Sequence, residues 1–262
     1  MENLKEKIRE YWTRSVPGFS EAAAKFDSGS REFFQLIDSR RYKNEPYVVK
    51  LLSDISRRRG KVLEIGFGMG ADLRYLATRK VNIVGMDLSF SNAFRTAQSL
   101  SLLELPGIVL NADAENLPFK NCSFDQIYSY GVLHHTPDTE KALSEIKRVL
   151  TQNGCFTIML YHRGLAFQWI RIQYFLNKLR GIKTTLGELI TRNYDHTPLS
   201  RMYSVSQLRD IFKDFEDIRI EIVTYGGIRN NKKFFWLYYL LNACPFLMRK
   251  LGSFAVITGM KR

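Results

Sequence analysis

The stretch that decides the fold is Lys61-Val-Leu-Glu-Ile65 followed by Gly66-Phe-Gly68-Met-Gly70-Ala71. Its first five residues form a short apolar run that stops at glycines, which is typical of a buried parallel strand. Glycines after such a strand let the backbone approach a ligand closely, and the helix that follows offers free N–H groups. The same string satisfies the dinucleotide pattern G-x-G-x-x-G/A, which is a weak signal by itself.

Outward from this stretch, strand and helix patterns alternate through residues 61–161. We expect helices at Ala71–Arg79, Phe90–Leu102 and Asp138–Leu150, and strands at Asn82–Met86, Gly107–Asn111, Ser123–Ser129 and Phe156–Tyr161. The alternation predicts an α/β fold with a doubly wound, mostly parallel, Rossmann-like sheet. Ligands of such sheets bind beyond the carboxyl ends of the strands.

The segments on either side do not alternate in this way. Residues 1–60 are expected to be helical, and Ser204–Gln207 is a capping box that opens a further helix. Two closing strands are expected at Ile218–Thr224 and Phe254–Met260. Leu165–Leu179 is predicted to be a basic amphipathic helix with one apolar side, made of Leu165, Trp169, Ile172, Leu176 and Leu179.

Composition narrows the class of protein. The chain has 262 residues, of which 45% are hydrophobic and 25% charged, which is ordinary globular usage and excludes disorder, collagen and coiled coil. Cys122, Cys155 and Cys244 cannot form a disulfide framework, so we expect reduced thiols and no metal site. The first residues lack the apolar core of a signal peptide, and the apolar run at 234–248 is too short to span a bilayer.

The net charge of +13 is unevenly distributed. Residues 61–150 carry 9 basic and 10 acidic side chains, whereas residues 151–262 carry 17 and 7. Nucleic acid, an anionic substrate or a membrane surface would each explain a basic end, and so would an ordinary solvated surface.

Three carboxylates lie at or next to the carboxyl ends of consecutive strands. Glu64 would repel a pyrophosphate and attract a cationic ligand group such as an ammonium, or it is bonded to backbone near the glycine-rich loop. Asp87 is placed to accept the hydroxyls of a ribose, or to cap the turn at Ser89. Asp113 is placed to accept from an adenine amine, with the Ala114 N–H on a ring nitrogen, or is an ordinary loop acid.

Together these motifs resemble the class I S-adenosylmethionine-dependent methyltransferases, in the small-molecule branch similar to quinone-biosynthesis methyltransferases. The matching residues are Glu64-x-Gly66-x-Gly68-x-Gly70, Asp87, Asp113-Ala114-Glu115-x-Leu117-Pro118-Phe119 and Gly131-Val-Leu-His-His135. They occur in order within residues 61–154 and are specific as a set. Phe67 departs from the small residue or Cys that is common after the first glycine.

The resemblance implies a seven-stranded sheet whose last strand is antiparallel, and S-adenosylmethionine as cofactor with S-adenosylhomocysteine as product. It also implies that Asp87 binds ribose, that Asp113 and Ala114 bind adenine, and that Gly66, Gly68 and Tyr130 line the methionyl part. The cofactor contacts expected on this basis are Glu64, Gly66, Phe67, Gly68, Gly70, Asp87, Leu88, Asp113, Ala114, Glu115, Tyr130, Gly131 and Tyr11.

In this branch the N-terminal helices close over the cofactor. We therefore divide the chain into an N-terminal helical lid (1–60), a cofactor-binding core (61–161), a substrate-side insertion (162–203) and a C-terminal completion of the sheet (204–262) with a helical insertion at 225–252. Tyr11 and Trp12 are candidates for an aromatic cap over the sulfonium, with Arg41 and Tyr42 as a second pair. Core packing is the alternative for each aromatic residue.

Catalysis requires a base only where the acceptor is a poor nucleophile such as a hydroxyl. His135 and His134 are expected beside the methyl group, as base or as residues that shape the cofactor loop, and His196 is a third candidate. The insertion offers a substrate lid made of Tyr161, Tyr194, Asp195 and Tyr203, although Asp195 also fits an Asx turn before Pro198.

The leading interpretation is methyl transfer to an O, N or C atom of a small-molecule metabolite that is anionic or lipophilic. RNA methylation and a methyltransferase fold without catalysis are alternatives; no RNA-binding module is visible, so nucleic acid is disfavoured as a partner. An NAD-dependent oxidoreductase would share Asp87. We expect a cytoplasmic monomer or homodimer. The apolar segment 234–241, with Lys232 and Lys233 before it, is either a helix buried under the lid or in a dimer interface, which we favour, or a site of peripheral membrane contact.

Overall fold

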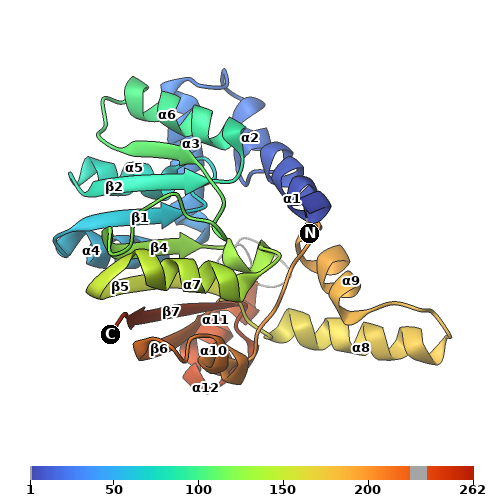
Figure 1. The fold of residues 1–262 in the computed structure, drawn as a ribbon. Coiled ribbons are helices and arrows are strands. Elements are labelled where there is room, and N and C mark those ends of the chain that lie inside the picture. Colours follow the sequence, from blue (N-terminus) through green and yellow to red (C-terminus); the bar gives the residue numbers. More distant parts are fainter. Residues whose placement is uncertain (1, 225–234) are drawn as a thin grey trace.

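The computed structural model describes residues 2–224 and 235–262. Its centre is a seven-stranded sheet in the order β3-β2-β1-β4-β5-β7-β6 (Figure 1). Strands β1 to β5 pair in parallel, and β7 is antiparallel to both of its neighbours. The strands are β1 Lys61–Ile65, β2 Asn82–Asp87, β3 Ile108–Asn111, β4 Phe124–Tyr130, β5 Leu150–Tyr161, β6 Glu216–Val223 and β7 Phe254–Met260. The predicted fold class, including the antiparallel last strand, is confirmed.

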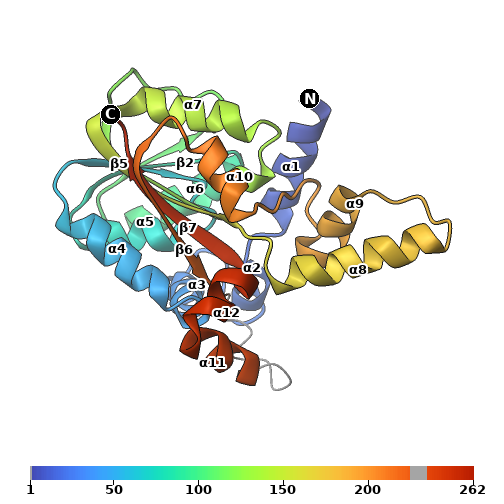
Figure 2. The ribbon, with the colours of Figure 1, turned by 90° about the horizontal axis from the view of Figure 1, so that it is seen from below.

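Helices cover both faces of the sheet, because residues of each strand alternate between two cores (Figure 2). Val62 faces α4, α5 and α6, whereas Leu63 faces α7 and α10. The bounds of these helices are α4 Tyr47–Arg57, α5 Ala71–Thr78, α6 Phe90–Leu102, α7 Thr139–Val149 and α10 Val205–Ile211. Both hydrogen bonds of the predicted capping box at Ser204 and Gln207 are present.

The N-terminal helices lie at the carboxyl ends of the strands. These are α1 Glu2–Arg14, α2 Phe19–Ala23 and α3 Arg31–Asn44. Phe33 and Phe34 of α3 are fully buried against Met69 and Ala71 of the glycine-rich loop. The 3-10 turn η1, Leu133–His135, follows β4 and also lies at the carboxyl ends of the strands.

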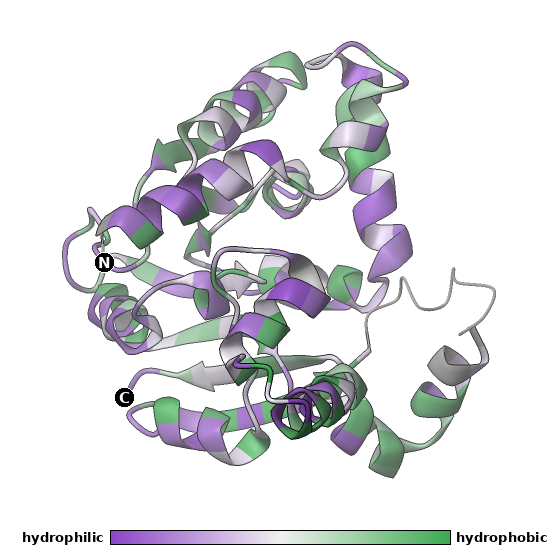
Figure 3. Cartoon of the chain, turned by 90° about the vertical axis from the view of Figure 1, so that its right-hand side faces the viewer, coloured by the Kyte–Doolittle hydropathy of each residue, from purple (hydrophilic) through white to green (hydrophobic). Residues whose placement is uncertain are grey.

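The segment after β5 projects from the body of the molecule (Figure 1). It contains α8 Leu165–Leu179, α9 Leu186–Ile190 and the π-helical turn η2 Thr191–Asp195. α11 Phe235–Ala243 and α12 Pro245–Leu251 lie between β6 and β7, and most of α11 is hydrophobic (Figure 3). None of the described helices is both long and apolar enough to cross a bilayer.

One strand is longer than the sequence indicated. β5 begins at Leu150 rather than at Phe156. Leu150 pairs with Phe124 before an irregularity in the register with β4. Asn153 then donates its N–H to the carbonyl of Lys261 at 3.0 Å, so the chain beyond β7 holds this polar stretch in the sheet.

Candidate active site

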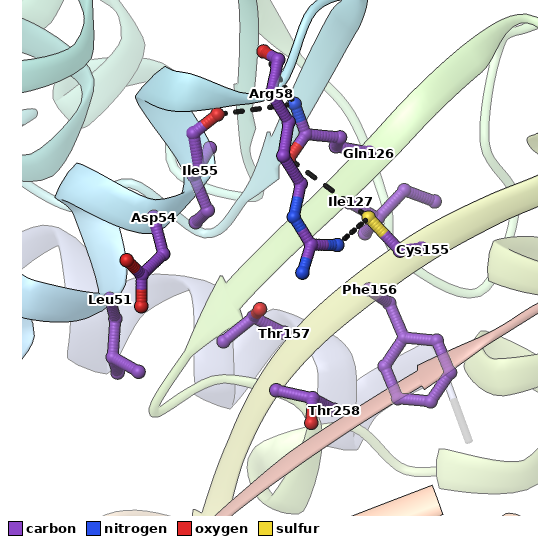
Figure 4. Close-up of a pocket in the computed structure, with 10 residues that line it drawn as sticks. All are labelled: Leu51, Asp54, Ile55, Arg58, Gln126, Ile127, Cys155, Phe156, Thr157 and Thr258. Carbon is purple, nitrogen blue, oxygen red and sulfur yellow. Dashed lines mark hydrogen bonds between the residues drawn. The ribbon is translucent and has the colours of Figure 1, made fainter. Parts of the chain in front are cut away.

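A cavity of about 630 Å³ lies where the parallel strands end, under α1 and α3. Thirteen of the predicted site residues line it: Trp12, Arg41, Glu64, Gly66, Gly68, Asp87, Leu88, Asp113, Ala114, Tyr130, Gly131, His135 and Tyr161. A second pocket, of about 80 Å³, lies between α4 and the strands β4, β5 and β7, beside Arg58 and Cys155 (Figure 4). Only the larger of these two cavities coincides with the strand ends at which such sheets bind ligands.

The glycine-rich loop forms one wall of the large cavity. Gly66 has φ +77°, and a Cβ on it would lie 2.2 Å from Cγ2 of Val132, so a larger residue would be both strained and obstructed. Gly68 donates its backbone N–H to Oδ2 of Asp87 at 2.9 Å. Phe67 points away from the cavity into the core under α4 to α6, which explains how a bulky residue fits between the two glycines.

Glu64 brings a buried carboxylate to the floor of the cavity. Its side chain belongs to β1 and the residue is 3% exposed, yet Oε2 has no hydrogen-bond partner among the described residues. Desolvation raises the pKa of Glu64 well above its usual range, and the nearby Asp72 carboxylate adds to this. A buried acceptor of this kind is a costly group unless a ligand donates to it.

Asp87 ends β2 and has two sets of neighbours. Its Oδ1 accepts from the Ser89 N–H at 2.8 Å and from the side chain of Asn92 at 3.2 Å, while Oδ2 accepts from Gly68. Asp87 thus caps the turn, as one interpretation predicts, and it also lines the cavity, where ribose binding stays a prediction. Desolvation raises the pKa of Asp87 to about 6 despite these three donors.

Asp113 is paired with a lysine from α1 that the sequence did not single out. Lys5 Nζ lies 2.6 Å from Asp113 Oδ2 and 2.6 Å from Glu115 Oε2. Glu115 Oε1 also accepts from the Asp138 N–H at 2.8 Å, and Glu115 does not line the cavity. Glu115, a predicted cofactor contact, thus binds Lys5 and helps to hold α1 beside Asp113.

A buried charged cluster closes the α3 side of the cavity. Arg41 donates to Asp72 at 3.1 and 2.7 Å and to Glu45 at 2.7 Å, and its guanidinium lies 4.1 Å from the centre of the Tyr130 ring. Tyr130 donates to Glu45 and contacts the hydroxyl of Tyr47. Burial raises the pKa of Tyr130 well above its usual range. Arg41, a predicted substrate contact, is already engaged by two carboxylates and fixes this wall.

The histidines of η1 face different surroundings. His135 lines the cavity, packs 5.0 Å from Trp12 between ring centres, and its Nδ1 lies 2.8 Å from the carbonyl of Leu199. His134 is fully buried, its tilted ring lies 3.7 Å from that of Tyr161 between ring centres, and neither of its ring nitrogens is in a described hydrogen bond. Desolvation lowers the pKa of His134 well below its usual range, so it stays neutral.

The remaining predicted residues lie outside the cavity wall. Tyr11 packs edge-on against Trp12, Tyr42 donates to the carbonyl of Ala71, and Gly70 caps α5. His196 is exposed, and Tyr203 is buried in the core with its hydroxyl 3.1 Å from Thr139. The side chains of Tyr194 and Asp195 lie outside the described part of the chain, as do Lys232, Lys233 and Phe234.

The sequence of this chain is similar to those of known proteins. A family model described as a methyltransferase domain matches residues 63–158. An uncharacterized protein of Methanocaldococcus jannaschii is 31% identical over 196 residues, which cover 71% of this chain and 73% of that protein. The chain belongs to the class I S-adenosylmethionine-dependent methyltransferases.

In another relative, the match covers a smaller part of the relative's length. Cycloartenol-C-24-methyltransferase of Arabidopsis thaliana is 32% identical over 120 residues, or 44% of this chain and 33% of that protein. The methyltransferase thus spans about a third of that curated relative. A solved S-adenosylmethionine-dependent methyltransferase from Aquifex aeolicus is 18% identical, covers 91% of this chain and all of its own, and superposes with a TM-score of 0.54, which shows a shared fold.

Sequence reasoning missed several residues of the methyltransferase cavity, among them the charged residues Glu45 and Lys5. Glu45 lies four residues after Arg41, directly after the last residue of α3, and that spacing would have paired them. Lys5 carried no signal, because its partners are more than a hundred residues away in the chain.

Proposed function

We propose that this methyltransferase transfers the methyl group of S-adenosylmethionine to an O, N or C atom of a small, lipophilic metabolite. The observation that carries the proposal is the buried carboxylate of Glu64, aimed into a cavity that Asp87 and Asp113 also line. Three acids around one cavity suit a ligand that carries an ammonium, a ribose and an adenine, and they disfavour the pyrophosphate of NAD.

The residues fit the cofactor in the following arrangement. Glu64 would hold the ammonium, Asp87 the ribose hydroxyls, and Asp113 with the Ala114 N–H the adenine edge. Gly66, Gly68, Tyr130 and Gly131 would line the methionyl part, and Leu88 would lie against the nucleoside. A bound S-adenosylmethionine supplies a methyl group that is already electrophilic, so the protein's task is to align an acceptor and exclude water.

The part of the cavity beyond the carboxylates is mainly aromatic and apolar. Trp12, Met159, Tyr161 and Phe254 line it. Such a surface favours a lipophilic acceptor over a polar one such as RNA. His135 is the proposed base for a hydroxyl acceptor, because a carbonyl can only accept from Nδ1, which leaves Nε2 as the nitrogen that takes a proton.

We propose that α1 to α3 act as the lid and that α8, α9 and η2 form the substrate side. Lys5, Ile8 and Trp12 of α1 line the cavity, which supports the first role, and Tyr161 and Ala166 support the second. We also propose a cytoplasmic location, supported by the free thiols of Cys122, Cys155 and Cys244.

The cofactor assignment is tested by isothermal titration with S-adenosylhomocysteine. Glu64→Gln should weaken binding by about 10- to 100-fold, the loss of one charge-assisted hydrogen bond. Glu140→Gln, on the exposed surface of α7, is the matched control and should bind as the unaltered protein does. Equal affinity in Glu64→Gln would contradict the proposed site.

The substrate class is tested by incubating the protein with methyl-labelled S-adenosylmethionine and cell extract. We expect label in the fraction extracted into organic solvent. Label confined to RNA would replace the proposal with the RNA alternative, and binding of the cofactor without any transfer would favour a fold that has lost catalysis.

A further inference from the structure

An apolar stripe along α8 faces solvent. Trp169, Phe175 and Leu179 are 59%, 60% and 68% exposed. The stripe also includes Leu165, Ile172 and Leu176, and Ile182 lies just beyond the helix; all are exposed. Spacings of three and four residues place these side chains along one side of the helix.

The stripe is not the face by which α8 packs on the protein. Phe167 and Ile170 make that contact, in a small core with Leu189, Ile190 and Met202. The helix is therefore anchored by one side and offers a second apolar side to solvent. Contiguous exposed apolar surface on a soluble chain marks an interaction site.

The charge around the stripe identifies the partner. Residues 163–183 contain five basic side chains and no acidic one. Arg171, Lys178, Arg180 and Lys183 are exposed. Trp, Phe and Leu beside Lys and Arg on one helix are typical of segments that lie in the interface of an anionic bilayer. A second copy packed stripe to stripe would bring the same positive charges together.

We propose that α8 docks the methyltransferase on the surface of an anionic membrane, with its apolar stripe among the acyl chains and its basic residues at the lipid headgroups. The first turn of α8 also borders the cavity, because Ala166 lines it together with Tyr161 and Phe254. Docking by α8 would thus set the acceptor side of the cavity against the lipid. That last step rests on the proposed lipophilic substrate, whereas docking itself does not.

Vesicle sedimentation tests the proposal on the full chain. We expect the protein to pellet with vesicles of phosphatidylcholine mixed with phosphatidylglycerol, to pellet at least about tenfold less with phosphatidylcholine alone, and to be released by salt. The triple variant Trp169→Ser, Phe175→Ser, Leu179→Ser should lose at least about tenfold in vesicle affinity. Reversing the charges of Lys178, Arg180 and Lys183 to Glu should have a similar effect.

A matched control removes equally exposed apolar residues elsewhere. Phe90 and Phe94 of α6 are 70% and 61% exposed, and Phe90→Ser with Phe94→Ser should leave vesicle binding unchanged. Titration with S-adenosylhomocysteine shows whether each variant is folded, so loss of docking is separated from loss of the proposed cofactor site.

Four outcomes would overturn the proposal. The protein could stay in solution with anionic vesicles, or the α8 triple variant could pellet as well as the unaltered chain. Light scattering could instead show a dimer that the triple variant converts to a monomer, in which case the stripe is a contact between copies. Loss of binding in a Trp236→Ser, Tyr239→Ser variant alone would move the docking surface to α11, where both residues are exposed.

Discussion

The carboxylate of Asp87 should make the stability of the ligand-free protein fall as the pH rises. Burial raises its pKa from the ordinary value of 3.8 to about 6, so the folded state holds a proton that the unfolded chain has released between these values. Because the folded state binds more protons there, the free energy of unfolding decreases with pH. The shift corresponds to about 2.5 kcal/mol lost between pH 4 and pH 7.

Asp87→Asn removes this titration while keeping a side chain of the same shape. The difference in the free energy of unfolding between the variant and the unaltered protein should therefore move by about 2.5 kcal/mol in favour of the variant from pH 4 to pH 7. Urea unfolding at several pH values measures it. In the same variant, affinity for S-adenosylhomocysteine should fall by about 10- to 100-fold, because an ionised acceptor for two hydroxyls is lost.

Asp125→Asn is the matched control. Asp125 also accepts a backbone N–H, from Lys61 at 2.8 Å, but it lies at the start of β4, whereas the cavity lies where the parallel strands end. This change should leave cofactor affinity intact. Parallel pH profiles for Asp87→Asn and the unaltered protein would refute the account of a desolvated carboxylate, and unchanged affinity would reduce Asp87 to a turn residue.

Three further predictions concern the lid, the proposed base and the cationic subsite. Lys5→Met should speed the release of S-adenosylhomocysteine by about fivefold in stopped-flow measurements, because a partly exposed ion pair to Asp113 holds α1 and such pairs contribute about 1 kcal/mol; an unchanged rate would show that α1 is held by other contacts. His135→Gln should lower kcat for a hydroxyl acceptor by about 100-fold or more while leaving cofactor affinity unchanged, whereas a loss of affinity alone would make it a pocket residue. Binding near neutral pH should release a proton from Glu64, whose pKa is raised by burial, because an ammonium favours the ionised form; the binding enthalpy should then vary with the ionisation enthalpy of the buffer, and Glu64→Gln should abolish that variation.

The core of the fold could be predicted because its signals are local. The predicted helix Phe90–Leu102 has the observed bounds, since Ser89 caps its start and accepts from the Asn92 N–H. Periodicity, helix caps and glycine turns depend on residues that are close together in the chain, and so does the position of an acid near the end of each strand. The cavity therefore collects Glu64, Asp87 and Asp113 as expected.

What could not be predicted depends on contacts between distant segments. The early start of β5 is set by pairing with β4 and by Lys261, and the ion pair of Lys5 joins α1 to the loop after β3. Composition cannot distinguish His134, buried and neutral, from its neighbour His135 at the cavity. In each case tertiary packing decides the role of a side chain whose local sequence is ambiguous.

α8 shows that sequence patterns do not settle which face of a helix is buried. The sequence predicts its bounds and its apolar side correctly, but an apolar side is ordinarily assigned to the core. In the structure Phe167 and Ile170 face the protein instead, and the predicted apolar side is exposed. Glu64 departs from expectation in the opposite direction, as a charge-bearing group buried without a partner on Oε2. Both departures cost stability in the isolated chain, and in our two proposals each would be relieved by a different ligand, a lipid surface for the first and a cation for the second. Function is expected where a structure exposes apolar side chains or buries a polar group without a partner, so binding experiments should address these two sites first.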